Sequence, residues 1–355
     1  MKNQILEITS ADKLIDRRRH MAHFFESGLM VGKSAWHGLG KTLDLPVSPC
    51  DAYVESGLNW KVEKKALYYK KGKIYTSLND LYALVRDRDG KALGTCTDTY
   101  KIFQNSEAFD LIATLVHSGK WTVNTCGSLK EGRICWVLLL QNTVDFQTND
   151  KHKQYLLMTW GHDGQTGVTF MPTTIRVVCW NTLSAALMDV NKVTFKHTEG
   201  VVNRLGGVID LFNDAAMTFD EQQAIFREML SIGISDTEIG DILHDIYAPQ
   251  SKDGKEPDKK EVMEAEDTIA NYKRFAIEAP TWEKKGAPSY NNYCKNTVYG
   301  LFNAITECNE YYRYGQRSKD IGYSVLYGTC MENNLQAYRW LINLCRSKRS
   351  STSLV

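Results

Sequence analysis

The first half of the chain alternates apolar and polar residues with the period of a β-strand. This alternation predicts strands throughout 58–100, and it predicts two further hairpins, one within 121–141 and one within 153–179. Successive side chains of a strand point to opposite faces, so each hairpin can bury one face and expose the other. The predicted turns are Asp89-Gly90, 130–132 and 162–164.

Helical spacing interrupts the strands and prevails after residue 199. Residues 48–57 form a short predicted helix, with Ser48 as the N-cap and Pro49 at the first position. In 105–118 the apolar residues recur every three or four positions, as on the buried face of an amphipathic helix. Further helices are predicted over 181–188, 200–216, 219–231, 236–247, 258–277, 291–314 and 330–345.

Strands followed by helices indicate an α+β fold. We expect an antiparallel, hairpin-rich N-terminal half with packed helices, followed by a mostly helical C-terminal half. The predicted divisions are a lead-in helix at 1–30, an α+β core at 31–198, a helical region at 199–345 with a linker-like stretch at 251–260, and a basic flexible tail at 346–355.

The composition is that of an ordinary globular protein. Of the 355 residues, 43% are apolar and 24% are charged, which excludes a disordered chain, a collagen-like fibre and a disulfide-rich miniprotein. The chain has no run of apolar residues long enough to span a membrane and no secretion signal, so we expect a cytoplasmic protein without a membrane partner. The nine cysteines include no C-x-x-C pair, so we expect buried thiols.

Charge is distributed unevenly, although the net charge is only +1. Residues 220–270 hold 14 acidic and 5 basic side chains, whereas 271–355 hold 12 basic and 6 acidic ones. The first hundred residues are also basic, with 16 basic side chains and 12 acidic ones. An acidic middle between two basic ends is compatible with a localised positive surface for a polyanion.

The strongest chemical signal is the segment 60–73, which holds six lysines, three aromatic residues and one acid. Single-stranded nucleic acid is bound by such mixtures, because cations follow the phosphates while flat rings stack on the bases. A solvated strand edge protected by lysines is the alternative interpretation. We predict phosphate contacts from Lys64, Lys65, Lys70, Lys71, Lys130, Arg133 and Arg176, and stacking contacts from Trp60, Tyr68 and Tyr69.

A further predicted contact follows the last predicted strand of the hairpin-rich half. Arg176 stands inside a β-branched run that leads directly into a predicted helix, and Asn181 stands where that helix begins. Free backbone amides at a helix N-terminus suit an anion, so Asn181 joins the predicted nucleic-acid contacts. A surface position paired with an acid is the alternative for Arg176.

No motif indicates catalysis. Neither G-x-S-x-G nor H-E-x-x-H occurs, and His162-Asp163 is interpreted as a polar turn, so we predict no catalytic residue, cofactor or metal. Residues 35–42, AWHGLGKT, fit a relaxed phosphate-loop pattern, but Pro46 argues against the helix that such a loop requires. A glycine-rich structural loop is the favoured interpretation, and an enzyme acting on nucleotides or nucleic acid is a third hypothesis.

Six segments occur in a characteristic order: AWHGLGK at 35–41, SGLNWKVEKKALYY at 56–69, LGTCTDTYKIFQNSEAFD at 93–110, GSLKEGRICWVLL at 127–139, HDGQTGVTFMPTTIRVVCWNTLSAAL at 162–187 and NTVYGLFNAITE at 296–307. Together they resemble a family of phage and plasmid proteins with a domain of unknown function, number 932. The resemblance implies a mobile-element origin and a host-cell cytoplasmic setting. By fold analogy alone, the core is similar to the single-strand annealing recombinases of phages, which act without ATP as oligomers with a basic groove.

These observations lead to a first functional hypothesis. It is a phage- or plasmid-encoded protein that binds single-stranded DNA as a homo-oligomer and promotes ATP-independent annealing and recombination. The alternative is a mobile-element interaction protein that inhibits a host factor such as a defence system. In that case the acidic stretch 220–270 would imitate nucleic acid or dock a basic host protein.

Overall fold

The computed structural model describes residues 25–32, 41–147, 150–176, 193–198, 215–251, 256–278, 294–309 and 329–352. They belong to two compact units. The described residues of unit 1 lie within 1–142, 155–172 and 191–215, and those of unit 2 lie within 143–154, 173–190 and 216–355. Each unit is therefore assembled from separated stretches of the chain, whereas the sequence had suggested contiguous divisions.

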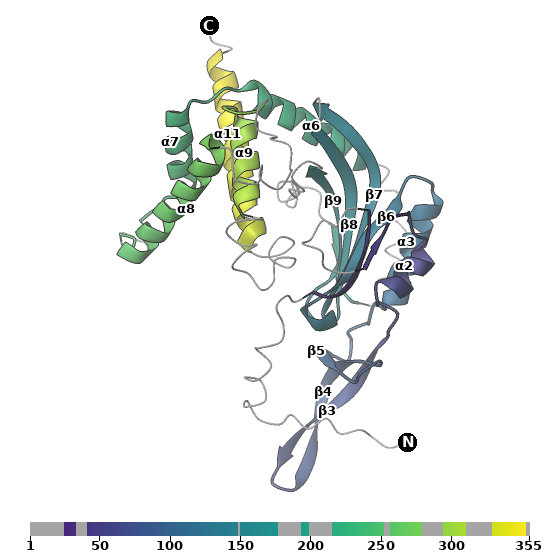
Figure 1. Ribbon diagram of the computed structural model, residues 1–355. Coiled ribbons are helices and arrows are strands. Elements are labelled where there is room, and N and C mark those ends of the chain that lie inside the picture. The colour runs from purple at the N-terminus through teal and green to yellow at the C-terminus, as the bar shows by residue number, and fades with distance from the viewer. Residues whose placement is uncertain are drawn as a thin grey trace. The chain divides into compact units, whose positions relative to one another are not determined.

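The larger sheet is mixed and has seven strands in the order β10-β9-β8-β7-β6-β1-β2 (Figure 1). β1 pairs with β6 in antiparallel and with β2 in parallel orientation. The edge strands β10 and β2 have only three residues each, which limits pairing with other chains. The strands are β1 Phe25–Val31, β2 Lys41–Leu43, β6 Thr122–Leu129, β7 Ile134–Gln147, β8 Asp150–Gly161, β9 Val168–Arg176 and β10 Val193–Phe195.

The smaller sheet lies in unit 1 and is antiparallel, in the order β3-β4-β5. Its strands are β3 Val62–Lys71, β4 Ile74–Arg86 and β5 Ala92–Thr97. β5 pairs only with the second half of β4, so β3 and the first half of β4 continue beyond it as a two-stranded ribbon (Figure 1). We call residues 68–81 the arm, which ends at Leu81, the first residue of β4 that pairs with β5.

Two helices pack side by side in unit 1, α2 Pro49–Glu55 and α3 Asn105–His117 (Figure 1). The Ser48 hydroxyl accepts a hydrogen bond from the backbone N–H of Asp51 at 3.1 Å, which is the predicted N-cap. Along α3, the side chains of Phe109, Ile112 and Leu115 are buried. The helices predicted at 48–57 and 105–118 are therefore confirmed.

The described helices of unit 2 are α6 Ala215–Ser231, α7 Asp236–Tyr247, α8 Lys259–Ile277, α9 Val298–Glu307 and α11 Thr329–Thr352. All ten residues of α9 are buried, so this helix forms the centre of the core. His152 is also fully buried in unit 2, where its Nε2 lies 2.9 Å from the Tyr299 hydroxyl and its Nδ1 accepts from the Gln223 amide at 3.0 Å. Its ring stacks on Phe146 with centroids 4.6 Å apart.

The α+β prediction is confirmed in its coarse form. The C-terminal half is not purely helical, because strands extend through β10, and the larger sheet is mixed rather than antiparallel throughout. The prediction of a helix up to residue 30 is wrong for 25–30, which form β1 between β6 and β2 because their backbone completes the sheet there. Residues 1–24 and the predicted helix at 181–188 lie outside the described residues.

The prediction of a flexible tail at 346–355 is wrong as far as Thr352, because α11 continues through that residue. Two of its basic side chains pair with acids inside unit 2. Lys348 Nζ lies 3.0 Å from a Glu238 oxygen, and Arg349 Nε lies 2.9 Å from a Glu228 oxygen. These ion pairs remove part of the positive charge that the sequence had offered for a polyanion.

Seven of the eight described cysteines are buried, and Cys50 is exposed. Burial raises the pKa of the Cys126 thiol to about 12 and that of Cys345 to about 11. Within the described ranges, no helix combines the length and apolar character needed to cross a bilayer. The same residues contain no cluster of His, Cys, Asp and Glu that could hold a metal ion.

Candidate nucleic-acid interface

The arm ends in a two-residue turn. Lys71 pairs with Ile74, and Gly72 has a φ of +63° at the first position of the turn. The tight turns that join antiparallel strands need a positive φ, which glycine adopts without strain. The sequence Lys71-Gly72-Lys73 thus reverses the chain and places two lysines at the tip.

Every residue of the arm is exposed to solvent. Single exposed apolar side chains are ordinary, but here they are concentrated. Ten large hydrophobic side chains are exposed in the described part of the chain, and six of them lie on the arm: Tyr68, Tyr69, Ile74, Tyr75, Leu78 and Leu81. A two-stranded ribbon with both faces in water is marginally stable by itself, which suggests that a ligand or a partner covers the arm.

The register divides the arm into two faces. Tyr68 is opposite Ser77 and Lys70 is opposite Tyr75, so these side chains share one face. The Lys70 ammonium lies 5.2 Å from the centre of the Tyr75 ring. The other face carries the paired residues Tyr69 and Thr76, followed by Lys71 and Ile74. Aromatic rings and lysines therefore occur on both faces.

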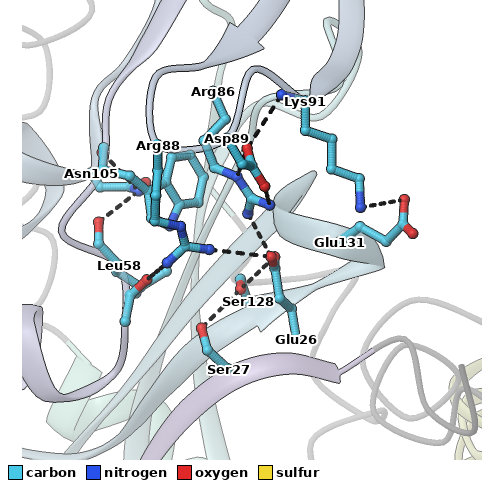
Figure 2. A network of polar contacts seen from close by, with 12 residues as sticks. Glu26, Ser27, Leu58, Arg86, Arg88, Asp89, Lys91, Asn105, Ser128 and Glu131 are labelled. Atoms are coloured by element: carbon cyan, nitrogen blue, oxygen red, sulfur yellow. Dashed lines mark hydrogen bonds and ion pairs between the residues drawn. The ribbon is translucent and has the colours of Figure 1, made fainter.

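The base of the arm is fixed by the buried Arg86, which ends β4 (Figure 2). Its Nε and Nη2 donate to the two carboxylate oxygens of Asp89 at 2.9 and 2.6 Å, and its Nη1 lies 2.6 Å from Glu26. The pairing with Arg86 lowers the pKa of Asp89 to about 2. The Arg86 guanidinium also lies 5.2 Å from the centre of the Trp60 ring. Such a network locks the end of β4 because each charge meets its opposite.

Side-chain hydrogen bonds hold β3 at the same end. The Gln104 side chain accepts from the Val62 N–H at 3.0 Å and donates to the Val62 carbonyl at 2.8 Å. Lys64 Nζ donates to the carbonyls of Asp98 at 2.6 Å and Thr97 at 3.3 Å. These bonds attach the base of the hairpin to the rest of unit 1.

A buried amide connects this base to the larger sheet. Asn105 is fully buried, and its Nδ2 donates to the Leu58 carbonyl at 2.9 Å. Its Oδ1 accepts from Trp160 Nε1 and His162 Nε2, both at 2.8 Å. His162 therefore holds its proton on Nε2, and burial lowers the pKa of this imidazole to about 3. His162-Asp163 lies in the turn between β8 and β9, as predicted, but His162 is buried there, with 1% of it exposed.

The predicted contact residues fall into two groups in the structure: some are exposed on the arm, and others are buried or bonded elsewhere in the chain. Trp60 is wrong as a stacking residue, because its ring is 2% exposed and packs against Arg86 and His162. Lys64 is directed to backbone carbonyls, and Lys65 pairs with Glu63 at 2.5 Å. The predicted residues that lie exposed on the arm are Tyr68, Tyr69, Lys70 and Lys71.

The remaining predicted contacts are not on the arm. Lys130 belongs to the 3-10 turn Lys130–Gly132 between β6 and β7, and Arg133 follows it with an exposed side chain. Gly132 has a φ of +89°, and a Cβ atom there would come within 2.6 Å of Arg86 Nη1. The Arg176 side chain and Asn181 lie outside the described residues, as does most of the phosphate-loop-like segment 35–42.

The sequence reasoning missed the second strand of the arm. The segment 60–73 ends at Lys73, and Ile74 and Tyr75, which follow directly after it, continue its mixture of polar and apolar side chains. A detectable signal was the Gly72-Lys73 pair between two runs of β-forming residues, which predicts a hairpin turn.

The comparisons with known proteins give a family and no function. No curated protein and no solved structure matches the chain. One family model, described as "Domain of unknown function (DUF932)", matches residues 92–325, about two thirds of the chain, from β5 in unit 1 to beyond α9 in unit 2. The chain therefore belongs to the DUF932 family, as its sequence segments had suggested.

Proposed function

We propose that the chain binds single-stranded DNA along its β3–β4 arm and that this binding serves annealing of complementary strands. The observation that carries the proposal is the coexistence of exposed tyrosines and lysines on a fixed ribbon. Between Val62 and Leu81, five lysines stand beside two acids, Glu63 and Asp80. Annealing needs no bond-making residue, since it requires only that phosphates are neutralised and bases are held extended.

The spacing of the tyrosines supports stacking on unpaired bases. Tyr68 pairs with Ser77, and Tyr75 lies two residues before Ser77 in β4. Tyr68 and Tyr75 are therefore diagonal neighbours on one face. Diagonal neighbours in an antiparallel pair are about 7 Å apart. Successive bases of a nucleic-acid strand are about 3.4 Å apart along the axis, so one base fits between two such rings. Bases of a duplex are already stacked on each other, which favours a single-stranded ligand.

Replacement of Tyr68 by alanine is expected to weaken binding of a labelled single-stranded oligonucleotide by about tenfold. Stacking of one base on one ring contributes about 1–3 kcal/mol, which corresponds to about 5- to 150-fold. Fluorescence anisotropy measures the change. Tyr68→Phe keeps the ring and should bind like the native chain, whereas equal losses for the two variants would contradict stacking.

Replacement of Lys70 and Lys71 by alanine is expected to make binding less dependent on salt. For a single strand, the logarithm of the association constant falls with the logarithm of the salt concentration by about 0.7 for each phosphate contact. Loss of two contacts should therefore reduce that slope by about 1.4. Titrations at several salt concentrations measure it, and Lys101→Ala with Lys120→Ala, two exposed lysines of unit 1 outside the arm, is the matched control. An unchanged slope in the arm variant would mean that Lys70 and Lys71 do not contact the phosphates.

The other functional hypotheses stay predictions. Inhibition of a host factor and catalysis on nucleotides are not favoured by any contact on the arm.

A further inference from the structure

A second exposed segment complements the arm in charge and in apolar character. It is the first part of α8, residues 259–267, in which every side chain except that of Ala265 is exposed. Burial against the core of unit 2 begins only at Thr268. Val262 and Met263 are 38% and 63% exposed there, so two of the four large exposed hydrophobic side chains that are not on the arm lie in this segment.

The charges of this segment oppose those of the arm. Residues 259–267 hold four acids and two lysines. Glu266 and Asp267 lie one helical turn after Val262 and Met263, so carboxylates border the two apolar side chains. A Glu266 carboxylate oxygen lies 3.8 Å from the His244 imidazole, and both side chains are exposed. The arm presents the reverse pattern, with lysines bordering tyrosines.

The two segments also agree in length. The four residue pairs from Tyr68–Ser77 to Lys71–Ile74 span about 13 Å at about 3.3 Å for each residue. The nine exposed residues at the start of α8 span about 13.5 Å at 1.5 Å for each residue. A ribbon laid along this helix therefore covers its exposed part from end to end.

From this complementarity we propose that the start of α8 is the docking site for the arm of a second copy of this chain. In a two-fold symmetric dimer each chain contributes one arm and one α8, so two identical contacts form. Each contact covers apolar side chains that are otherwise exposed on both segments and joins lysines to carboxylates at its border. This interaction goes beyond nucleic-acid binding, and because it occupies the arm, it makes self-association and DNA binding compete.

Sedimentation velocity of the full chain at low and high salt tests the proposal. The native chain is expected to self-associate at about 50 mM salt and to dissociate as salt rises, because border ion pairs are screened. Lys70→Glu with Lys71→Glu reverses the arm, and Glu266→Lys with Asp267→Lys reverses α8. Each reversed variant alone should self-associate at least about tenfold more weakly than the native chain.

Mixing the two reversed variants is the decisive measurement. In the mixture a negative arm meets a positive α8 and a positive arm meets a negative α8, so association should return to the native level. Lys101→Glu with Lys120→Glu, which changes the charge equally outside the arm, should self-associate like the native chain. A native chain that is monomeric at every salt concentration, self-association that survives both reversals, or a mixture that stays monomeric would each overturn the proposal.

Oligonucleotide binding of the same variants separates this proposal from the proposed function. The α8 reversal leaves the arm intact, so that variant should bind single-stranded DNA at least as tightly as the native chain. A chain that self-associates as described but binds no oligonucleotide would refute the proposed function alone. A chain that binds the oligonucleotide but never self-associates would refute the docking proposal alone.

Discussion

Arg86→Met lowers the free energy of unfolding of unit 1 by about 3–5 kcal/mol, the largest mutational effect that we expect in the described part of the chain. The guanidinium is 2% exposed and interacts with both Glu26 and Asp89. Its removal leaves the Glu26 carboxylate, which is 21% exposed, without its closest cation. Urea unfolding followed by tryptophan fluorescence measures the loss, because Trp60 lies against Arg86.

Arg88 provides a matched control for this variant. It is the same residue type two positions away and approaches the same Glu26, but at 3.4 Å and with 45% of its side chain exposed. Exposed ion pairs contribute at most about 1 kcal/mol, so Arg88→Met should have a small effect. Adding Glu26→Gln to Arg86→Met should recover part of the lost stability, because the uncompensated carboxylate is then absent. Equal costs for the two arginine variants would mean that burial of Arg86 is not what matters.

Acidification destabilises unit 1 through His162. Its folded-state pKa is lowered to about 3, mainly by burial, with His197 acting in the same direction and Asp163 in the opposite one. The imidazole of the unfolded chain has a pKa of about 6.5, so between these two values only the unfolded chain takes up the proton. Stability is therefore complete above pH 6.5 and falls by about 1.4 kcal/mol for each pH unit below it, by at most about 5 kcal/mol near pH 3.

His162→Gln separates this effect from the titration of carboxylates. A glutamine can still donate to Asn105 but does not gain a proton in this range. The difference in free energy of unfolding between the native chain and the variant, measured by urea unfolding, should shift by about 2–3 kcal/mol between pH 7 and pH 4.5. Parallel pH profiles for the two chains would show that His162 is protonated in the folded state.

Local patterns of the sequence predicted the local structure. The N-cap at Ser48, the periodicity of 105–118 and the turn at Asp89-Gly90 each depend on neighbouring residues, and each has the predicted structure. The helix predicted at 236–247 is α7, with the same bounds. Alternation along β3 divides its lysines and rings between two faces, as the register with β4 shows.

Contacts between distant residues could not be predicted in this way. Trp60 lies within a basic, aromatic segment, yet it is buried because Arg86 and His162 pack around it. One partner of Arg86, Glu26, is 60 residues away in the sequence. Asn105 likewise bonds to Trp160 and His162, which are more than 50 residues away. A single sequence contains no signal for such pairs, so the anchor of the arm could be identified only from the structure.

The position of β1 and α11 has a consequence for anyone who shortens this chain. The family match covers 92–325, whereas β1 lies at 25–31 and α11 at 329–352. A chain cut to the matched segment would lack β1, so the edge of β6 would be unpaired. It would also lack α11, whose Tyr338 and Leu341 belong to the core around α9. The recognisable signature of the family is thus smaller than the piece of chain that can fold, and truncation boundaries should be chosen from the strand order and the helix packing.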